Sequence, residues 1–189
     1  MKRIIAAFAL LLVATNSVDA EPQISFDGGI DRIAVPANSP VRYAGMRKEN
    51  GDPVASFRGK FLLSGTYYYG DNDFNDSGDE KPSEYVFDPQ AYIIPDRDIA
   101  GRLPHFVVRN GTQTIFLTNP VAFAKAAVPE RDAHRVRCRS CGDATGHIAI
   151  WVDHFSAGID CDAPSYDARF LSVANPIKTA IVPKPDRAC

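Results

Sequence analysis

The sequence predicts a single mainly-β domain, either an antiparallel β-sandwich or a partly open β-barrel, with one short helix at about 120–127. Many short segments rich in β-branched and aromatic residues are separated by turn residues. Only one segment carries the start and stop signals of a helix. Because no second helix pattern separates the strands, repeated units of strand, helix and parallel strand are not expected.

Residues 1–20 have the pattern of a signal peptide. A basic start, Met1-Lys2-Arg3, precedes an apolar run at 4–13, and Val18-Asp19-Ala20 fits a cleavage site with small residues. This run is too short to cross a hydrocarbon core of about 30 Å, so no membrane span is expected. We expect cleavage near Ala20 and a mature chain, 21–189, that forms one disulfide-stabilised domain in the periplasm or outside the cell.

The first strands of the mature chain are expected at 23–26 and 32–35, paired with each other, and the clearest strand is expected at 57–69. In this segment the odd positions are apolar or glycine and the even positions are mostly polar, so the odd side chains should face the core. Gly59 and Gly65 fall on that inner face, which indicates a bend or a second backbone packed closely there.

The middle of the chain predicts a further strand, a hairpin and the helix. A strand at 85–94 is interrupted by Pro89, and Asn110-Gly111 between the β-prone segments 106–108 and 114–117 is typical of a hairpin turn. Asn119 is suited to cap the helix, and Pro120 is suited to the first helical position. Val128-Pro129 should end the helix.

Strands are also expected at 147–153 and 168–173. In the first, Ile148, Ile150 and Val152 share the core face. The outward positions then include His147, Trp151 and Asp153, a combination that suits a platform for a carbohydrate or a peptide. The alternative is that a loop or a neighbouring sheet covers the tryptophan. Because neighbours on a strand point to opposite faces, Asp153 and His154 are expected to make a poor catalytic dyad.

The four cysteines form an even set in a chain that is expected to be exported, which favours two structural disulfides. They are Cys138, Cys141, Cys161 and Cys189. Three pairings remain open. A second interpretation is a zinc site made by His134, Cys138, Cys141 and His147, and a third is a redox-active Cys138-x-x-Cys141 pair among arginines.

An acidic segment at 73–84 resembles the calcium-binding loop of an EF-hand in its spacing of oxygen ligands. The candidate ligands are Asp73, Asn75, Ser77, Asp79 and Glu84. The resemblance covers this loop alone, since a strand precedes it in place of a helix. The alternative is a solvated acidic hairpin loop without a bound cation.

Three arginines, Arg135, Arg137 and Arg139, would share one face if the segment 134–140 is extended. Guanidinium groups about 7 Å apart on a strand suit phosphate, sulfate or carboxylate groups. The alternatives are an edge strand that carries charge to resist aggregation, or internal pairing with the acidic segment.

The composition and charge are those of an ordinary globular domain, and the formal net charge of -2 gives no sign of a nucleic-acid partner. The chain has no short motif of a serine hydrolase, a zinc protease, a nucleotide-binding loop or a dinucleotide site. We therefore expect an exported, non-enzymatic binding module without a cofactor, whose ligand is a protein, a carbohydrate or an anion and whose contact surface lies at 131–153. A metal-binding module and a small secreted hydrolase are the alternatives.

N-terminal sequencing of the exported protein tests the signal peptide. The expected first residue is Glu21, because cleavage follows the small residue Ala20. Recovery of the exported protein with Met1 at its N-terminus would contradict the prediction.

Overall fold

The computed structural model describes residues 22–26, 29, 31–72, 86–107, 109, 112–137, 141–175 and 179–182. The expected signal peptide and the expected calcium loop at 73–84 thus lie outside the described residues. The strands are β1 Gln23–Phe26, β2 Asp31–Ala34, β3 Arg42–Glu49, β4 Asp52–Arg58, β5 Phe61–Asp71, β6 Pro89–Pro95, β7 His105–Phe106, β8 Ile115–Leu117, β9 Asp143–Asp160, β10 Ala163–Val173 and β11 Ala180–Val182. The helices are α1 Arg97–Ala100, α2 Pro120–Ala127 and α3 Glu130–Arg135.

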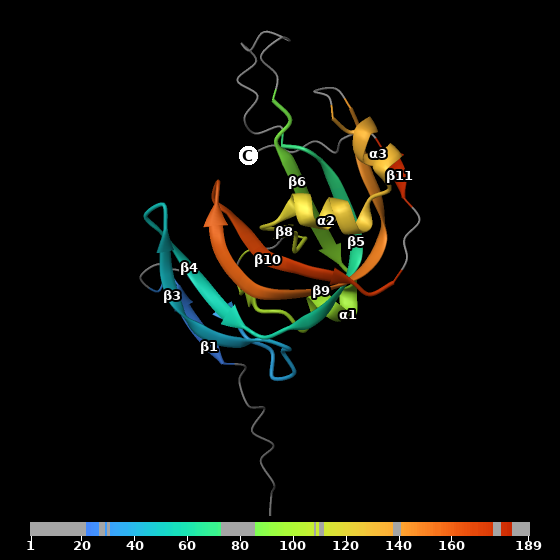
Figure 1. Cartoon of the computed structure of the whole chain (residues 1–189). Helices are drawn as coiled ribbons and strands as arrows, with labels where there is room; N and C mark the ends of the chain where they lie inside the picture. The colour runs from blue at the N-terminus through green and yellow to red at the C-terminus, as the bar shows by residue number, and fades with distance from the viewer. Residues whose placement is uncertain are drawn as a thin grey trace, which may run out of the picture.

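Five strands close into a barrel in the order β5, β6, β8, β10, β9 and back to β5 (Figure 1). Every pairing around the barrel is antiparallel except that of β8 with β10, which is parallel. The helices α2 and α3 lie between β8 and β9 in the chain. A five-stranded Greek-key barrel is the architecture of the OB-fold. The mainly-β prediction is confirmed, and strand pairing gives it the form of a barrel.

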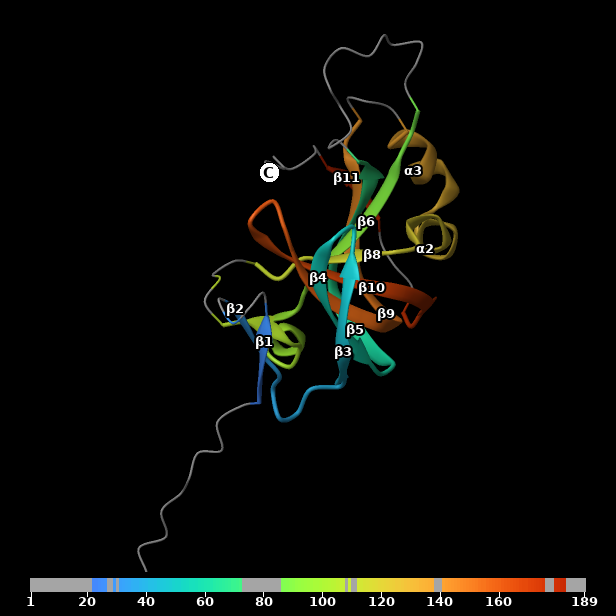
Figure 2. The same ribbon diagram turned by 90° about the vertical axis from the view of Figure 1, so that its left-hand side faces the viewer.

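The barrel is filled by aromatic side chains and closed at both ends. At one end, Phe123 of α2 packs against Tyr67 and Phe170, with ring centroids 5.4 and 5.5 Å away. At the other end a small sheet, β1-β2-β7, brings Phe106 against Tyr166 and Phe26. Figure 2 shows this small sheet and α2 on opposite sides of the barrel.

The alternation expected over 57–69 is confirmed, although the segment forms two strands. Phe57, Phe61, Leu63, Tyr67 and Tyr69 are all buried. The chain kinks between β4 and β5, where Gly59 has a φ of +146°, and a Cβ at that position would lie 2.7 Å from the carbonyl oxygen of Pro40. A Cβ at Gly65 would lie 2.2 Å from the carbonyl oxygen of Ile94. Both glycines are therefore required by close backbone packing.

The helix expected at about 120–127 is α2, and β1 and β2 pair as expected. Two more short helices, α1 and α3, were not predicted because four and six residues are too few to show a helical period. The hairpin expected around 110–111 is wrong. The strand before it, β7, pairs with β2 in the small sheet, whereas β8 pairs with β6 and β10 in the barrel. Long-range pairing prevailed over the local turn signal.

The barrel wall bends where β9 passes from one neighbour to the next. Along one edge β9 pairs with β5 at Val152 and then with β4 at Ser156. Along its other edge, His154 and Phe155 face Ala168 of β10 alone, which is a β-bulge. His154 has a φ of +52°, a conformation uncommon outside glycine. At this bend the β3–β4 hairpin leaves the barrel and projects beyond it (Figure 1).

The close packing at Gly65 predicts a destabilised variant. We expect Gly65→Ala to lower the free energy of unfolding by about 2–3 kcal/mol, since the new methyl group would overlap the β6 backbone. The control is Gly101→Ala, where the nearest atom would lie at an ordinary 3.5 Å and φ is -67°. Urea unfolding measures both. Equal stability of the two variants would contradict the packing described.

Candidate functional site

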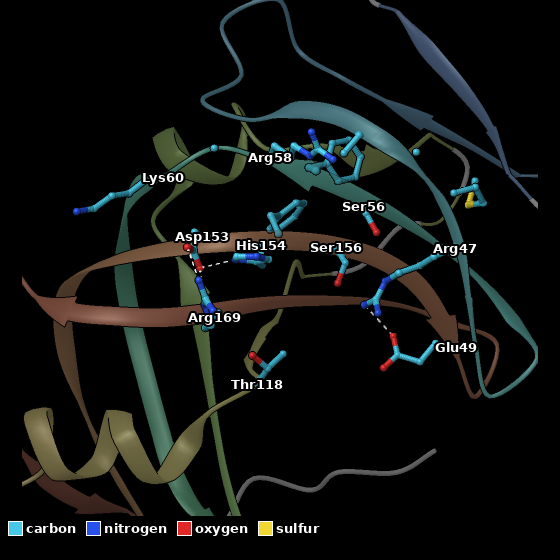
Figure 3. Close-up of a pocket in the computed structure, with 16 residues that line it drawn as sticks. Arg47, Glu49, Ser56, Arg58, Lys60, Thr118, Asp153, His154, Ser156 and Arg169 are labelled. Atoms are coloured by element: carbon cyan, nitrogen blue, oxygen red, sulfur yellow. Dashed lines mark hydrogen bonds and ion pairs between the residues drawn. The ribbon is translucent and has the colours of Figure 1, made fainter.

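A groove of about 960 Å³ lies at the bend, between the β3–β4 hairpin and the outer face of β9 and β10 (Figure 3). The sequence places it there because the even positions of β4 and the outward positions of β9 turn their side chains away from the barrel interior. Its polar lining residues are Arg47, Glu49, Ser56, Arg58, Lys60, Thr118, Asp153, His154, Ser156 and Arg169.

The groove carries more positive than negative charge. Arg47, Arg58, Lys60 and Arg169 line it, together with two carboxylates, those of Glu49 and Asp153. Arg47 pairs with Glu49 at 2.8 Å, and Arg169 pairs with Asp153 at 2.8 Å. Among the described residues neither Arg58 nor Lys60 has an ion-pair partner. The arrangement therefore offers two cations to a bound anion.

Asp153 is held by two cationic or potentially cationic neighbours. Arg169 donates to both carboxylate oxygens, from Nε at 2.9 Å and Nη2 at 2.8 Å, and Nδ1 of His154 lies 2.8 Å from Oδ1. The hydrogen bonds from Arg169, together with His154, lower the pKa of Asp153 to about 2. The carboxylate is thus ionised across the ordinary pH range and fixes the guanidinium in the groove.

The contact between Asp153 and His154 corrects an expectation from the sequence. Adjacent residues of a regular strand point to opposite faces, and on that ground the sequence predicts a poor catalytic dyad. The positive φ at His154 breaks the alternation and turns the imidazole back toward Asp153, as Figure 3 shows. A bulge of this kind commonly redirects a side chain next to a functional site.

Asp167 lies on β10 beside the groove and is an unusual carboxyl group. Burial is the main cause of a raised pKa; together with the negative charges of Glu49 and Asp160, and against the opposing charge of Arg47, it brings the pKa of Asp167 to about 6. Its main-chain neighbours across the sheet are Ser156 and Phe116. At neutral pH the folded protein therefore keeps a desolvated and mostly ionised carboxyl group next to the groove.

A second group of outward side chains lies on β5 and β9. Trp151 pairs directly across the sheet with Leu62, and Nζ of Lys60 lies 5.0 Å from the centre of the indole ring. Further along β9, Nε2 of His147 lies 3.0 Å from Asp96, and the hydroxyl group of Ser64 donates to Asp96 at 2.6 Å. The Ser64 hydrogen bond and, less strongly, His147 lower the pKa of Asp96.

In OB-fold barrels the outer face of the second and third barrel strands commonly holds the ligand. Counted along the chain, the second and third strands of this barrel are β6 and β8. Their outward side chains, with one from β5, form a row of three aromatic rings. Tyr68 stacks on Tyr92 at 4.9 Å, and Phe116 lies 5.7 Å beyond. Tyr92 is only 7% exposed, so this row does not offer an open stacking surface.

The expected arginine ladder is wrong. Arg135 is the last residue of α3, where it lies 3.7 Å from Asp132, so the segment is not extended there. Arg137 follows the helix and lies over the ring of Phe87 at 5.8 Å. Arg139 lies outside the described residues. A helical turn therefore disperses side chains that a strand would have aligned.

The structure brings together three of the other expected ligand-binding residues, His147, Trp151 and Asp153, on the outer face of β9. Trp151 is 37% exposed and no loop of the described chain covers it fully. The groove residues Arg58, Lys60 and Arg169 were missed. The outward parity of 57–69 was a usable signal for the first two, whereas the pairing of Arg169 depends on the β9–β10 register.

The described part of the chain holds no group of three or more histidine, cysteine or acidic residues that could bind a metal ion. It therefore gives no support to the zinc and calcium interpretations. The calcium candidates Asp73, Asn75, Ser77, Asp79 and Glu84 lie outside it. Of the zinc candidates, His134 lies 3.8 Å from Glu130 and His147 contacts Asp96.

Cys141 and Cys161 are disulfide-bonded, while Cys138 and Cys189 lie outside the described residues, so the pairing stays a prediction. Cys141 is followed by β9, whereas a redox-active pair would be expected at the start of a helix.

Comparisons with family models, with curated proteins and with solved structures find no match to this chain. Within the described ranges, no helix combines the length and the apolar character needed to cross a membrane. The site therefore has to be interpreted from its own geometry.

The raised pKa of Asp167 predicts a pH-dependent gain in stability for Asp167→Asn. Because its carboxyl group titrates near 3.8 when unfolded and at about 6 when folded, ionisation costs stability as the pH rises from about 4 to 6. We expect the variant to gain about 1–3 kcal/mol in free energy of unfolding at pH 7 and nothing at pH 4.

Chemical denaturation at the two pH values measures this gain. Asp52→Asn, at an exposed position of the β3–β4 turn, is the control and should change little at either pH. A gain for Asp167→Asn that is equal at both pH values would show that the desolvated charge is not its cause.

Proposed function

We propose that this chain is an exported, non-enzymatic binding module and that the groove at the bend of β9 binds an anionic ligand. The observation that carries the proposal is the charge of the groove. Four cations and two carboxylates line it, and two of the cations, Arg58 and Lys60, have no ion-pair partner among the described residues. Guanidinium groups are suited to carboxylate, sulfate and phosphate because they donate two parallel hydrogen bonds.

The groove is also ordered in advance of binding. Asp153 holds the guanidinium of Arg169 through two hydrogen bonds, and the β-bulge at His154 is part of the barrel wall. A preformed site loses less side-chain entropy on binding than one that must be ordered by its ligand. Export is supported by the leader pattern at 1–20 and by the disulfide bonds at Cys141 and Cys161.

A small hydrolase is the second candidate, and one observation favours it. A carboxylate bonded to Nδ1 of a histidine, as Asp153 is to His154, is the arrangement that orients a general base. Depolymerisation of a polymeric ligand that is abolished by His154→Asn would support this candidate. Asparagine is chosen because it tolerates a positive φ.

The binding proposal predicts a site-specific charge effect. The variant Arg47→Gln/Arg58→Gln should bind polygalacturonate, dextran sulfate or polyglutamate at least about tenfold more weakly than the unaltered protein, since it removes two of the four cations that line the groove and leaves Glu49 without its partner Arg47. The control, Arg102→Gln/Arg131→Gln, has the same net charge but alters exposed arginines that do not line the groove.

Titration calorimetry on all three proteins gives the comparison. Equal weakening of both double variants would show that only overall charge matters. Failure of all three anionic polymers to bind the unaltered protein would remove the proposed function.

A further inference from the structure

We infer that the anionic ligand is a linear acidic oligosaccharide, which runs out of the groove over Lys60 and across Trp151 to His147 and Asp96. The inference rests on the proposed function and adds to it the class of the ligand and a second subsite. The second subsite is the β5–β9 platform, formed by Leu62 and Ser64 of β5 with Ala149 and Trp151 of β9.

The β5–β9 platform is flat and partly apolar. Leu62 and Trp151 face each other across the two strands and are 41% and 37% exposed. The next outward pair, Ser64 and Ala149, has small side chains, so the indole ring is open on that side, while the side chain of Lys60 lies over it from the groove. Sugar rings present an apolar face of C–H groups, and an exposed indole next to small residues offers that face a surface to stack on.

Lys60 joins the platform to the groove. The same side chain lines the groove and lies 5.0 Å over the indole of Trp151. Figure 3 shows it extending away from Arg58 and His154, toward the outside of the groove. A ligand that left the groove at this point would keep a cation beside it as it reached the ring.

Beyond the platform lies a polar cluster of Ser64, Asp96 and His147. The carboxylate of Asp96 accepts hydrogen bonds from both partners, at 2.6 Å from Ser64 and 3.0 Å from His147, and remains partly exposed. A carboxylate oxygen has room for several hydrogen bonds, and sugar hydroxyl groups are donors. From Asp153 to His147 the outward positions of β9 extend over about 20 Å, which requires a ligand of several residues.

The same features disfavour a peptide or a nucleic acid. Both edges of β9 at Trp151 are already paired, with Leu62 of β5 and Ser172 of β10, so an extended peptide finds no free main-chain groups there. A nucleic acid has few hydrogen-bond donors on its sugar–phosphate backbone, whereas each ring of a sugar acid carries hydroxyl groups that can donate to the carboxylates of Asp96 and Asp153. In an acidic oligosaccharide the carboxylates can pair with the cations of the groove, and the hydroxyl groups can donate to the carboxylates of the protein.

The test uses the fluorescence of Trp151, because it is the only tryptophan of the chain. The unaltered exported protein is titrated with oligogalacturonates, as di-, tetra- and hexasaccharide, and with neutral maltohexaose, polyglutamate and oligothymidylate. We expect the hexagalacturonate to change the fluorescence and to bind at least about tenfold more tightly than the disaccharide.

Variants separate the two subsites. By calorimetry, Trp151→Ala should lower the affinity for the hexasaccharide to that for the disaccharide and leave the affinity for the disaccharide unchanged. Trp151→Phe should restore part of the lost affinity. The control Val121→Ala alters an exposed apolar residue of α2 and should have no effect. Arg47→Gln/Arg58→Gln should weaken both saccharides.

Three results would overturn the inference while the proposed function stands. One is binding of the hexagalacturonate that depends on Arg47 and Arg58 but neither changes the fluorescence nor responds to Trp151→Ala. The others are equal binding of maltohexaose, or binding of polyglutamate or oligothymidylate with the same dependence on Trp151. If no anionic probe binds, the proposed function fails as well.

Discussion

The closure of the barrel and the position of the groove both follow from the bend of β9 at His154. A strand of eighteen residues must pair with β5 to close the barrel and then with β4 to support the projecting hairpin. Both pairings require the backbone of the barrel wall to turn, and it turns at two residues with positive φ: His154 within β9, and Gly59 in the connection between β4 and β5. Most residues disfavour a positive φ, so the surrounding packing has to stabilise the backbone at these two positions.

The groove is a consequence of that bend. Where β3 and β4 leave the barrel, the outer face of β9 and β10 is left beneath them, and the groove is the space between. The bulge also turns His154 onto Asp153, which in turn holds Arg169. One backbone irregularity therefore positions three charged or titratable side chains. The same region includes the desolvated carboxyl group of Asp167, whose raised pKa means that its ionisation costs stability at neutral pH.

The sequence predicted what depends on local pattern, and it failed where distant strands decide. The alternation of 57–69, the bounds of the helix at Pro120–Ala127 and the outward position of Trp151 follow from spacing along the chain. The expected cap is wrong, because the side chain of Asn119 makes no cap hydrogen bond and instead bonds the main chain of Phe170. The parallel pairing of β8 with β10, by contrast, joins residues about fifty apart and has no local signal. The contact of Asp153 with His154 needs a β-bulge, and the groove cations come from three strands and the β4–β5 connection, so neither could be predicted from spacing.

Amide chemical-shift mapping of the ¹⁵N-labelled protein during titration with hexagalacturonate would locate the binding site residue by residue. We expect the largest shifts at Arg47, Arg58 and His154 in the groove and at the backbone and indole N–H of Trp151. We expect little change at Phe116 and Tyr92 on the outer face of β6 and β8. Shifts concentrated on that face, or on α3 near Arg135, would contradict the claim that the bend of β9 forms the binding site.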